Sequence, residues 1–173
     1  MQDSNPSQST GSRGGKYLTF CLGREEYGIE ILKVQEIIGL LPFTPIPRAP
    51  DFIKGVINLR GKIIPVMDLR LKLGMPEAPR TEETCIIIVR TQVDMGIIVD
   101  RVNEVLDITE GSIDDTPALG GGINMEFILG IAKAQDGVKL LLAIDRVLSK
   151  TETRAVADAG GQQTDVIKSE EAQ

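Results

Sequence analysis

Short runs of apolar residues, separated by polar turn residues, recur along most of this chain. Residues 17–22 alternate between apolar and polar side chains with the period of two that is typical of a half-buried strand. The other predicted strands cover residues 27–29, 34–39, 55–59, 62–66, 85–89, 95–99, 102–108, 128–134 and 138–144. Runs of this length, bounded by Gly, Asn and Asp, predict a mainly β protein.

The second half of the chain repeats the pattern of the first. Residues 27–38 align without a gap on residues 95–106, and residues 52–56 match residues 127–131. A repeat of this length is typical of one supersecondary unit used twice. Because a unit of about 68 residues buries only a marginal core, we expect two small five-stranded barrels that share an apolar core. The pattern leaves open whether a terminal strand of one half completes the barrel of the other.

Polar and Pro/Gly-rich stretches divide the chain into segments. In order, we expect a flexible tail (1–15), the first barrel repeat (16–75), a linker (76–83), the second barrel repeat (84–150) and a C-terminal tail (151–173) that is partly helical or disordered. Residues 109–126 are predicted to form a mobile insertion. Asp68 and Asp145 are predicted to cap two short helices, because each follows an apolar strand and precedes a helix-compatible stretch.

Composition excludes several classes of function. The net charge of −6 argues against a general nucleic-acid binder, which needs a basic face. The chain has no histidine, the commonest general base and a common metal ligand. Its two cysteines, Cys21 and Cys85, lie in separate apolar runs and are interpreted as small buried hydrophobic residues. We therefore expect no catalytic residue, no metal site and no cofactor.

The sequence also bears on cellular location. It has no run of 18 apolar residues, and its N-terminus lacks the basic and apolar regions of a signal peptide. These features predict a cytoplasmic protein without direct membrane insertion.

The segment Asn58-Leu59-Arg60-Gly61 is the most distinctive candidate for binding. The repeat places an ordinary Asp136-Gly137 turn where the first half has Arg60-Gly61. A purely structural turn has little use for arginine, whereas its planar guanidinium suits carboxylates and protein interfaces. Two further kinds of residue recur at matching repeat positions, namely Glu36 with Glu104 and Val34 with Val102. The strand pattern and core packing also explain those recurrences.

Three blocks in order, residues 26–37, 52–61 and 64–70, resemble the CheW family of bacterial chemotaxis coupling proteins. The resemblance covers about residues 16–150 and implies two SH3-like five-stranded barrels on a shared apolar core, with short helices. It further implies a non-enzymatic adaptor in the cytoplasm that couples transmembrane chemoreceptors to the histidine kinase CheA. The implied partners are the regulatory domain of CheA and the cytoplasmic tips of methyl-accepting chemotaxis proteins.

The resemblance also implies a receptor-binding groove between the two barrels. Carried over by motif, the groove comprises Val34, Glu36, Gly55, Asn58, Arg60 and Val102. Its apolar residues would pack against a receptor helix, and Arg60 would act as a polar clamp at the rim. The kinase-binding residues are not assigned. Two alternatives stay open, a detached regulatory module of a CheA- or CheV-like protein and a double barrel that binds a small ligand.

Overall fold

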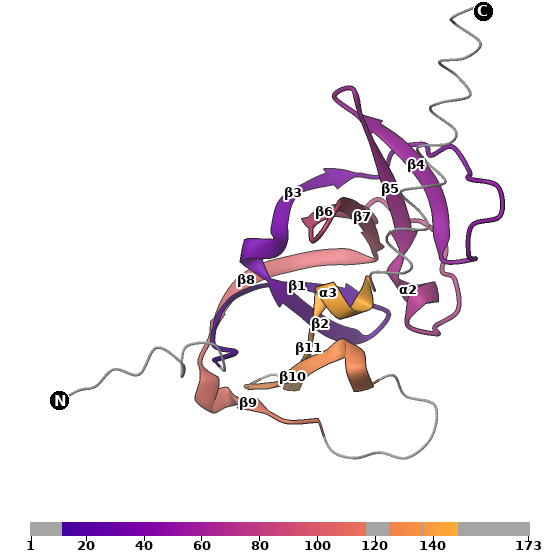
Figure 1. The fold of residues 1–173 in the computed structure, drawn as a ribbon. Helices are drawn as coiled ribbons and strands as arrows, with labels where there is room; N and C mark the ends of the chain where they lie inside the picture. The colour runs from indigo at the N-terminus through magenta and orange to yellow at the C-terminus, as the bar shows by residue number, and fades with distance from the viewer. Residues whose placement is uncertain (1–11, 117–124, 136, 149–173) are drawn as a thin grey trace, which may run out of the picture.

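In the computed structural model, residues 12–116, 125–135 and 137–148 are described, and they form two β-sheets joined by short helices (Figure 1). The strands are β1 (Gly15–Leu22), β2 (Glu25–Glu30), β3 (Val34–Gly39), β4 (Ile53–Leu59), β5 (Lys62–Asp68), β6 (Cys85–Arg90), β7 (Asp94–Val99), β8 (Arg101–Ile108), β9 (Ile113–Asp114), β10 (Ile128–Ala134) and β11 (Gly137–Leu142). The helical segments are η1 (Ile31–Lys33), α2 (Leu69–Lys72), η2 (Glu110–Ser112), η3 (Met125–Phe127) and α3 (Ile144–Val147). The predicted fold class, mainly β with two SH3-like subdomains, is confirmed.

Each sheet takes strands from both halves of the repeat. One sheet has the order β8-β1-β2-β11-β10-β9 and the other β3-β6-β7-β5-β4. The two orders coincide when repeat-equivalent strands are matched, apart from the two-residue β9. Each sheet also contains one parallel pair, β2 with β11 and β5 with β7. Strands are therefore exchanged between the halves, and the expected repeat boundaries, 16–75 and 84–150, do not separate the two sheets.

Two repeat-equivalent glycines let neighbouring strands pack closely. A Cβ atom on Gly96 would lie 2.8 Å from Cγ2 of Ile86, and a Cβ atom on Gly28 would lie 3.0 Å from Cδ2 of Leu141. Both distances are shorter than ordinary van der Waals contact. The glycine of the repeated motif is thus explained by lack of space beside the sheet.

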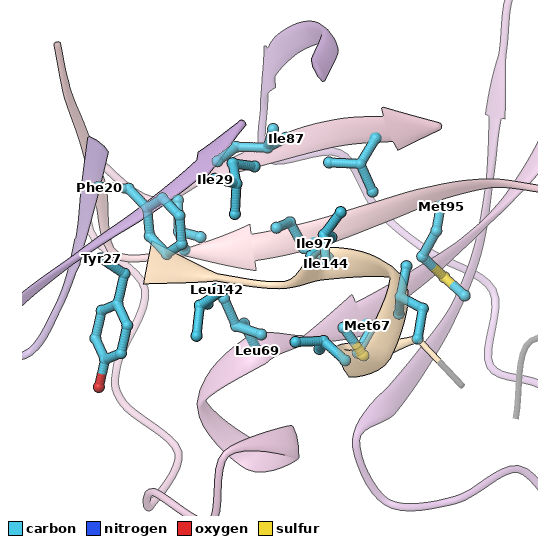
Figure 2. Packing of buried hydrophobic residues seen from close by; sticks show 14 of the residues in the cluster. Phe20, Tyr27, Ile29, Met67, Leu69, Ile87, Met95, Ile97, Leu142 and Ile144 are labelled. Atoms are coloured by element: carbon cyan, nitrogen blue, oxygen red, sulfur yellow. The ribbon is translucent and has the colours of Figure 1, made fainter. Parts of the chain in front are cut away.

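Buried side chains form three apolar clusters, one within each sheet and one between the sheets. The cluster between the sheets is the largest and receives residues from both, including Phe20 and Ile29 of one sheet and Ile87 and Ile97 of the other (Figure 2). This is the shared apolar core that the sequence predicts. Its burial links the stability of the two subdomains, because neither sheet covers this face by itself.

Strand β1 differs from its expected half-buried character. All six residues from Tyr17 to Leu22 are buried. The strand lies between β2 and β8. Leu18, Phe20 and Leu22 contribute to the shared core, whereas Tyr17 belongs to the cluster within its own sheet. Thr19 is buried as well, and its hydroxyl donates a hydrogen bond to the carbonyl oxygen of Glu104 at 2.8 Å. The alternation of apolar and polar residues in this strand therefore does not mark a solvent-exposed face, because both faces of the strand are buried.

One of the two predicted helix caps is present. The Asp68 carboxylate accepts hydrogen bonds from the backbone amides of Arg70 and Leu71 and caps α2, as expected. The prediction for Asp145 is wrong, because Ala143 is the N-cap of α3 and makes no side-chain cap. Asp145 lies in the first turn of α3, where its carboxylate accepts a hydrogen bond from Lys33 Nζ at 2.8 Å.

The predicted tails and insertion fall partly outside the described residues. Residues 1–11, 117–124 and 149–173 lie outside them. Within the expected N-terminal tail, Arg13 forms ion pairs with Glu110 at 3.0 Å and with Asp115 at 2.8 Å. Within the expected insertion 109–126, η2, β9 and η3 form. Parts of the expected tail and of the expected insertion are therefore ordered and pack on the folded domain.

The two cysteines differ in burial. Cys21 is buried as predicted, but Cys85 is only partly buried. Desolvation raises the pKa of the Cys85 thiol. Both cysteines are free thiols.

Candidate functional site

The hairpin between β4 and β5 presents Arg60 at its tip. Leu59 pairs with Lys62, which leaves Arg60 and Gly61 as a two-residue turn. Their φ angles are 53° and 86°, the left-handed values of a type I′ hairpin turn. The side-chain oxygen of Asn58 accepts a hydrogen bond from the Gly61 amide at 2.8 Å and closes the turn. Asn58 therefore shapes the turn that carries Arg60.

Arg60 forms an ion pair with Glu36, so two of the predicted groove residues are in contact. The Arg60 side chain is 69% exposed and that of Glu36 33% exposed. The residues come from β3 and from the β4–β5 hairpin, which lie at opposite ends of the strand order in their sheet. The ion pair therefore joins segments that are not hydrogen-bonded neighbours in the sheet.

Val34 and Val102 supply apolar surface at the border of the shared core. Both are partly buried and pack against the cluster that lies between the two sheets. Each lies on an edge strand of its sheet, Val34 on β3 and Val102 on β8. The structure thus places both residues at the border between the two subdomains.

Sequence reasoning missed two further apolar residues on these edge strands. Ile37 of β3 is 44% exposed and Val105 of β8 is 47% exposed. In the strand pairing they face Ile87 and Leu18, which belong to the shared core. Ile37 and Val105 occupy matching positions of the repeat, a signal that could have found them.

Gly55, the glycine among the predicted groove residues, has a clear structural role. It is buried, its φ angle is 147°, and a Cβ atom there would lie 2.2 Å from the Thr44 carbonyl oxygen. It is five residues from Arg60 along β4, roughly 16 Å in an extended strand. The close approach of Thr44 to Gly55 therefore allows the 41–50 connection to pack against β4.

A cavity of about 350 Å³ lies elsewhere, beside the linker and the β1–β2 turn. Its lining includes Cys21, Asp100 and Arg101. Asp100 accepts hydrogen bonds from Arg70 and from the Gly23 amide, and the Cys21 sulfur accepts one from Arg101. These polar groups bind one another, so the cavity gives no support to the alternative of a small-ligand double barrel.

Within the described ranges, no helix combines the length and the apolar character needed to cross a bilayer.

Comparison with known proteins agrees with this architecture. Residues 16–152 match the family model described as a CheW-like domain. The chemotaxis protein CheW of Klebsiella aerogenes is 41% identical over 144 residues, which are 83% of this chain and 87% of that protein. The Helicobacter pylori chemotaxis protein CheW is 33% identical, over 78% of this chain and 82% of that protein.

A solved structure shows the same fold. The crystal structure of the scaffolding protein TtCheW from Thermoanaerobacter tengcongensis aligns with a TM-score of 0.73 and 38% sequence identity. The alignment covers 79% of this chain and 93% of that one. With the family model, the relatives and the exchanged-strand fold in agreement, the chain belongs to the CheW family of chemotaxis adaptor proteins.

Proposed function

We propose that this protein is a non-enzymatic, cytoplasmic adaptor that couples the tips of transmembrane chemoreceptors to the histidine kinase CheA. The observation that carries the proposal is the exposed Glu36–Arg60 ion pair beside β3, the edge strand whose Val34 packs at the border of the shared core, as Val102 of β8 does. Apolar edge-strand residues next to a charged pair suit an amphipathic receptor helix, whose apolar face packs while polar groups fix its register.

The conformation of Arg60 supports a role in binding. A non-glycine residue with φ of 53° adopts a left-handed conformation that costs roughly 1 kcal/mol for most side chains. Asparagine or glycine would suit this turn position better. An arginine held there at some cost to stability is explained when its guanidinium has a second task, which we assign to receptor contact.

For the kinase contact, we propose which domains pair but not which residues touch. Pairing of this protein's subdomains with the similarly built regulatory domain of CheA would place receptor and kinase on different faces of one adaptor. Individual contacts of this kind are weak, and repeated contacts in a receptor array raise the effective affinity. We assign no kinase-binding residues.

A reconstituted phosphorylation assay tests the proposal. Receptor-containing membranes, CheA and this protein are mixed, and the rate of CheA autophosphorylation is measured with wild-type protein, without it, and with Arg60→Asn. We expect wild type to activate the kinase and Arg60→Asn to lose most of that activation, because asparagine keeps the turn but removes the guanidinium.

Arg48→Asn is the matched control. Arg48 is also an exposed arginine with positive φ, at 65°, but it lies in the 41–50 connection. We expect this variant to activate like wild type. Equal activation by Arg60→Asn and wild type would contradict the assigned role of Arg60, and no activation by wild type would contradict the adaptor proposal itself.

A further inference from the structure

A second polar cluster lies beside the Glu36–Arg60 pair, and Asp94 is at its centre. The Asp94 side chain is only 8% exposed. Its carboxylate accepts hydrogen bonds from Gln35 Nε2 at 2.6 Å and from Arg90 Nε at 3.3 Å, and it forms an ion pair with Lys62. One acidic group at the start of β7 thus contacts three other strands of the same sheet.

Two of these contacts reach residues that lie close in sequence to Glu36 and Arg60, the pair that we call the clamp. Gln35 is the extra residue of a β-bulge in β3, because Val34 and Glu36 face consecutive residues of β6. Lys62 is the first residue after the Arg60-Gly61 turn and pairs with Leu59. Asp94 therefore holds the bulge that precedes Glu36 and the strand that follows Arg60.

Sheet hydrogen bonding does not connect these two segments directly. In the order β3-β6-β7-β5-β4, two strands separate β3 from β5. Within the described residues, two polar contacts link the bulge to the hairpin at this end, one through the Glu36–Arg60 pair and one through Asp94. The Asp94 link is the more buried of the two, so water weakens it less.

The carboxylate stays charged near neutral pH. Burial by itself would raise the pKa of Asp94, but hydrogen bonds from Lys62, Arg90 and Gln35 outweigh this effect and lower it. An ionised carboxylate accepts stronger hydrogen bonds than a neutral acid does. The link is thus fully formed under physiological conditions.

The other sheet contains the same arrangement without the clamp. Asn103, the repeat equivalent of Gln35, donates a hydrogen bond to Glu26 at 2.6 Å, and Lys139 pairs with the same carboxylate at 2.9 Å. Glu26 is the repeat equivalent of Asp94, but the hairpin between β10 and β11 has no arginine at its turn. An acid that anchors a bulge is therefore common to both sheets, and Asp94 does so next to the Glu36–Arg60 pair.

We propose that Asp94 is a positioning residue for the receptor contact, holding the Glu36-bearing strand and the Arg60-bearing hairpin at the spacing that the clamp requires. The proposal rests on the proposed function for its effect on binding. Its effect on the Arg60 side chain can be measured without any receptor.

The first experiment uses the full-length free protein. The Nε–Hε signal of Arg60 is followed by NMR relaxation in wild type, Asp94→Asn, Asp94→Glu and the matched control Glu26→Gln. We expect greater side-chain mobility in Asp94→Asn, wild-type behaviour in Glu26→Gln, and recovery toward wild type in Asp94→Glu. Unchanged Arg60 mobility in Asp94→Asn would overturn the proposal.

The second experiment measures binding of a soluble fragment of a chemoreceptor's cytoplasmic tip to the same proteins and to Arg60→Asn. We expect Asp94→Asn to raise the dissociation constant about fivefold. We expect the double variant to bind like Arg60→Asn alone, because both substitutions act through the same clamp. A full additional fivefold loss in the double variant would overturn the positioning role. If Arg60→Asn alone binds like wild type, the receptor site of the proposed function fails, and the mobility measurement still decides the role of Asp94.

Lys62→Gln serves if Asp94→Asn does not fold. Its side chain is 60% exposed, so its removal disturbs little packing, and it breaks the link to the hairpin while Asp94 keeps Gln35 and Arg90. The same increase in Arg60 mobility is expected, and unchanged mobility would count against the proposal.

Discussion

At the scale of single residues, two positions with positive φ angles, Arg60 and Gly55, have different explanations. Arg60 has positive φ at a position that asparagine or glycine would occupy more easily. Gly55 has positive φ and no room for a side chain, because the Thr44 carbonyl lies against it. The first residue therefore suggests a task in binding, whereas the second is required by the backbone.

Replacing Arg60 should separate stability from function. Arg60→Asn is expected to change the free energy of unfolding by no more than about 1 kcal/mol, and in the stabilising direction, because an Asn-Gly pair fits the turn and the lost ion pair is exposed. Urea denaturation followed by circular dichroism measures this. Marked destabilisation would show that Arg60 supports the fold, and its assignment to binding would lose its basis.

Gly55→Ala should destabilise the fold by roughly 2 kcal/mol or more, since the new Cβ atom would collide with backbone in a strained conformation. Gly39→Ala is the control, because a Cβ atom there meets no atom within 4 Å. Its free energy of unfolding should stay within about 0.5 kcal/mol of wild type. Equal stability of the two variants would show that Thr44 does not pack on Gly55 as described.

The sequence predicted single residues unevenly. Asp68 was recognised as a helix cap because it directly precedes a helical stretch. Asp145 has a similar sequence context, but α3 begins two residues earlier than a cap at Asp145 requires, and this carboxylate binds Lys33 instead. Glu36 and Arg60 were both named from motifs. The residues around Asp94 were missed because their contacts join strands that are distant in the chain.

At the scale of elements, Asp100 connects pieces from both halves of the repeat. Its carboxylate accepts two hydrogen bonds from the Arg70 guanidinium, at 2.8 Å and 2.6 Å, and one from the Gly23 amide at 2.7 Å. The carboxylate thereby ties α2 and the β1–β2 turn to the end of β7. The hydrogen bonds from Arg70 are the main reason that the pKa of Asp100 is lowered.

This contact should make stability depend on pH in a stated direction. Because the folded-state pKa of Asp100 lies below the unfolded-state value, the unfolded chain binds more protons in acid, and the contribution of Asp100 is lost as pH falls below about 5. Asp100→Asn should therefore cost about 1 to 2 kcal/mol at pH 7 and clearly less at pH 3. Urea denaturation at both pH values measures the difference.

Asp107→Asn is the control for this measurement. Asp107 pairs with Lys16, and both side chains are mostly exposed. Exposed pairs of this kind contribute little, so a cost below about 0.5 kcal/mol is expected at either pH. A cost of Asp100→Asn that is the same at pH 3 as at pH 7 would be inconsistent with the charged contact.

The positions of the strands along the chain are largely predictable from the sequence, whereas the pairing of the strands in the sheets is not. The turn between β4 and β5 and the bounds of β3 follow from local signals, namely Arg60-Gly61 and the apolar run of residues 34–39. Strand pairing depends on contacts between distant segments, such as the parallel pairing of β2 with β11. Local pattern holds no information on that choice, and so the exchange of strands stayed open.

At the scale of the whole molecule, the exchanged strands make the two halves interdependent. The first repeat, residues 16–75, holds all but the first residue of β1 and the whole of β2 to β5, yet β1 and β2 belong to one sheet and β3 to β5 to the other. The shared core receives side chains from both sheets (Figure 2). Neither half can therefore complete a sheet or cover the core by itself.

Cutting the chain in the linker tests this interdependence. The separate fragments 1–78 and 79–173 are each expected to lack a cooperative unfolding transition, because each leaves strand edges and apolar faces exposed. An equimolar mixture should recover a cooperative transition and dispersed NMR signals. A fragment that folds cooperatively when alone would contradict the exchanged-strand architecture.

We propose that the receptor contacts the edge strands β3 and β8 at the border of the shared core, together with the Glu36–Arg60 pair. The most direct measurement is an NMR titration of labelled full-length protein with a soluble chemoreceptor tip fragment. We predict saturable shifts concentrated at Val34, Glu36, Arg60 and Val102, and much smaller shifts on the β10–β11 hairpin. Saturable binding with its shifts confined to that hairpin, or to any surface away from β3, β8 and the β4–β5 turn, would contradict the account.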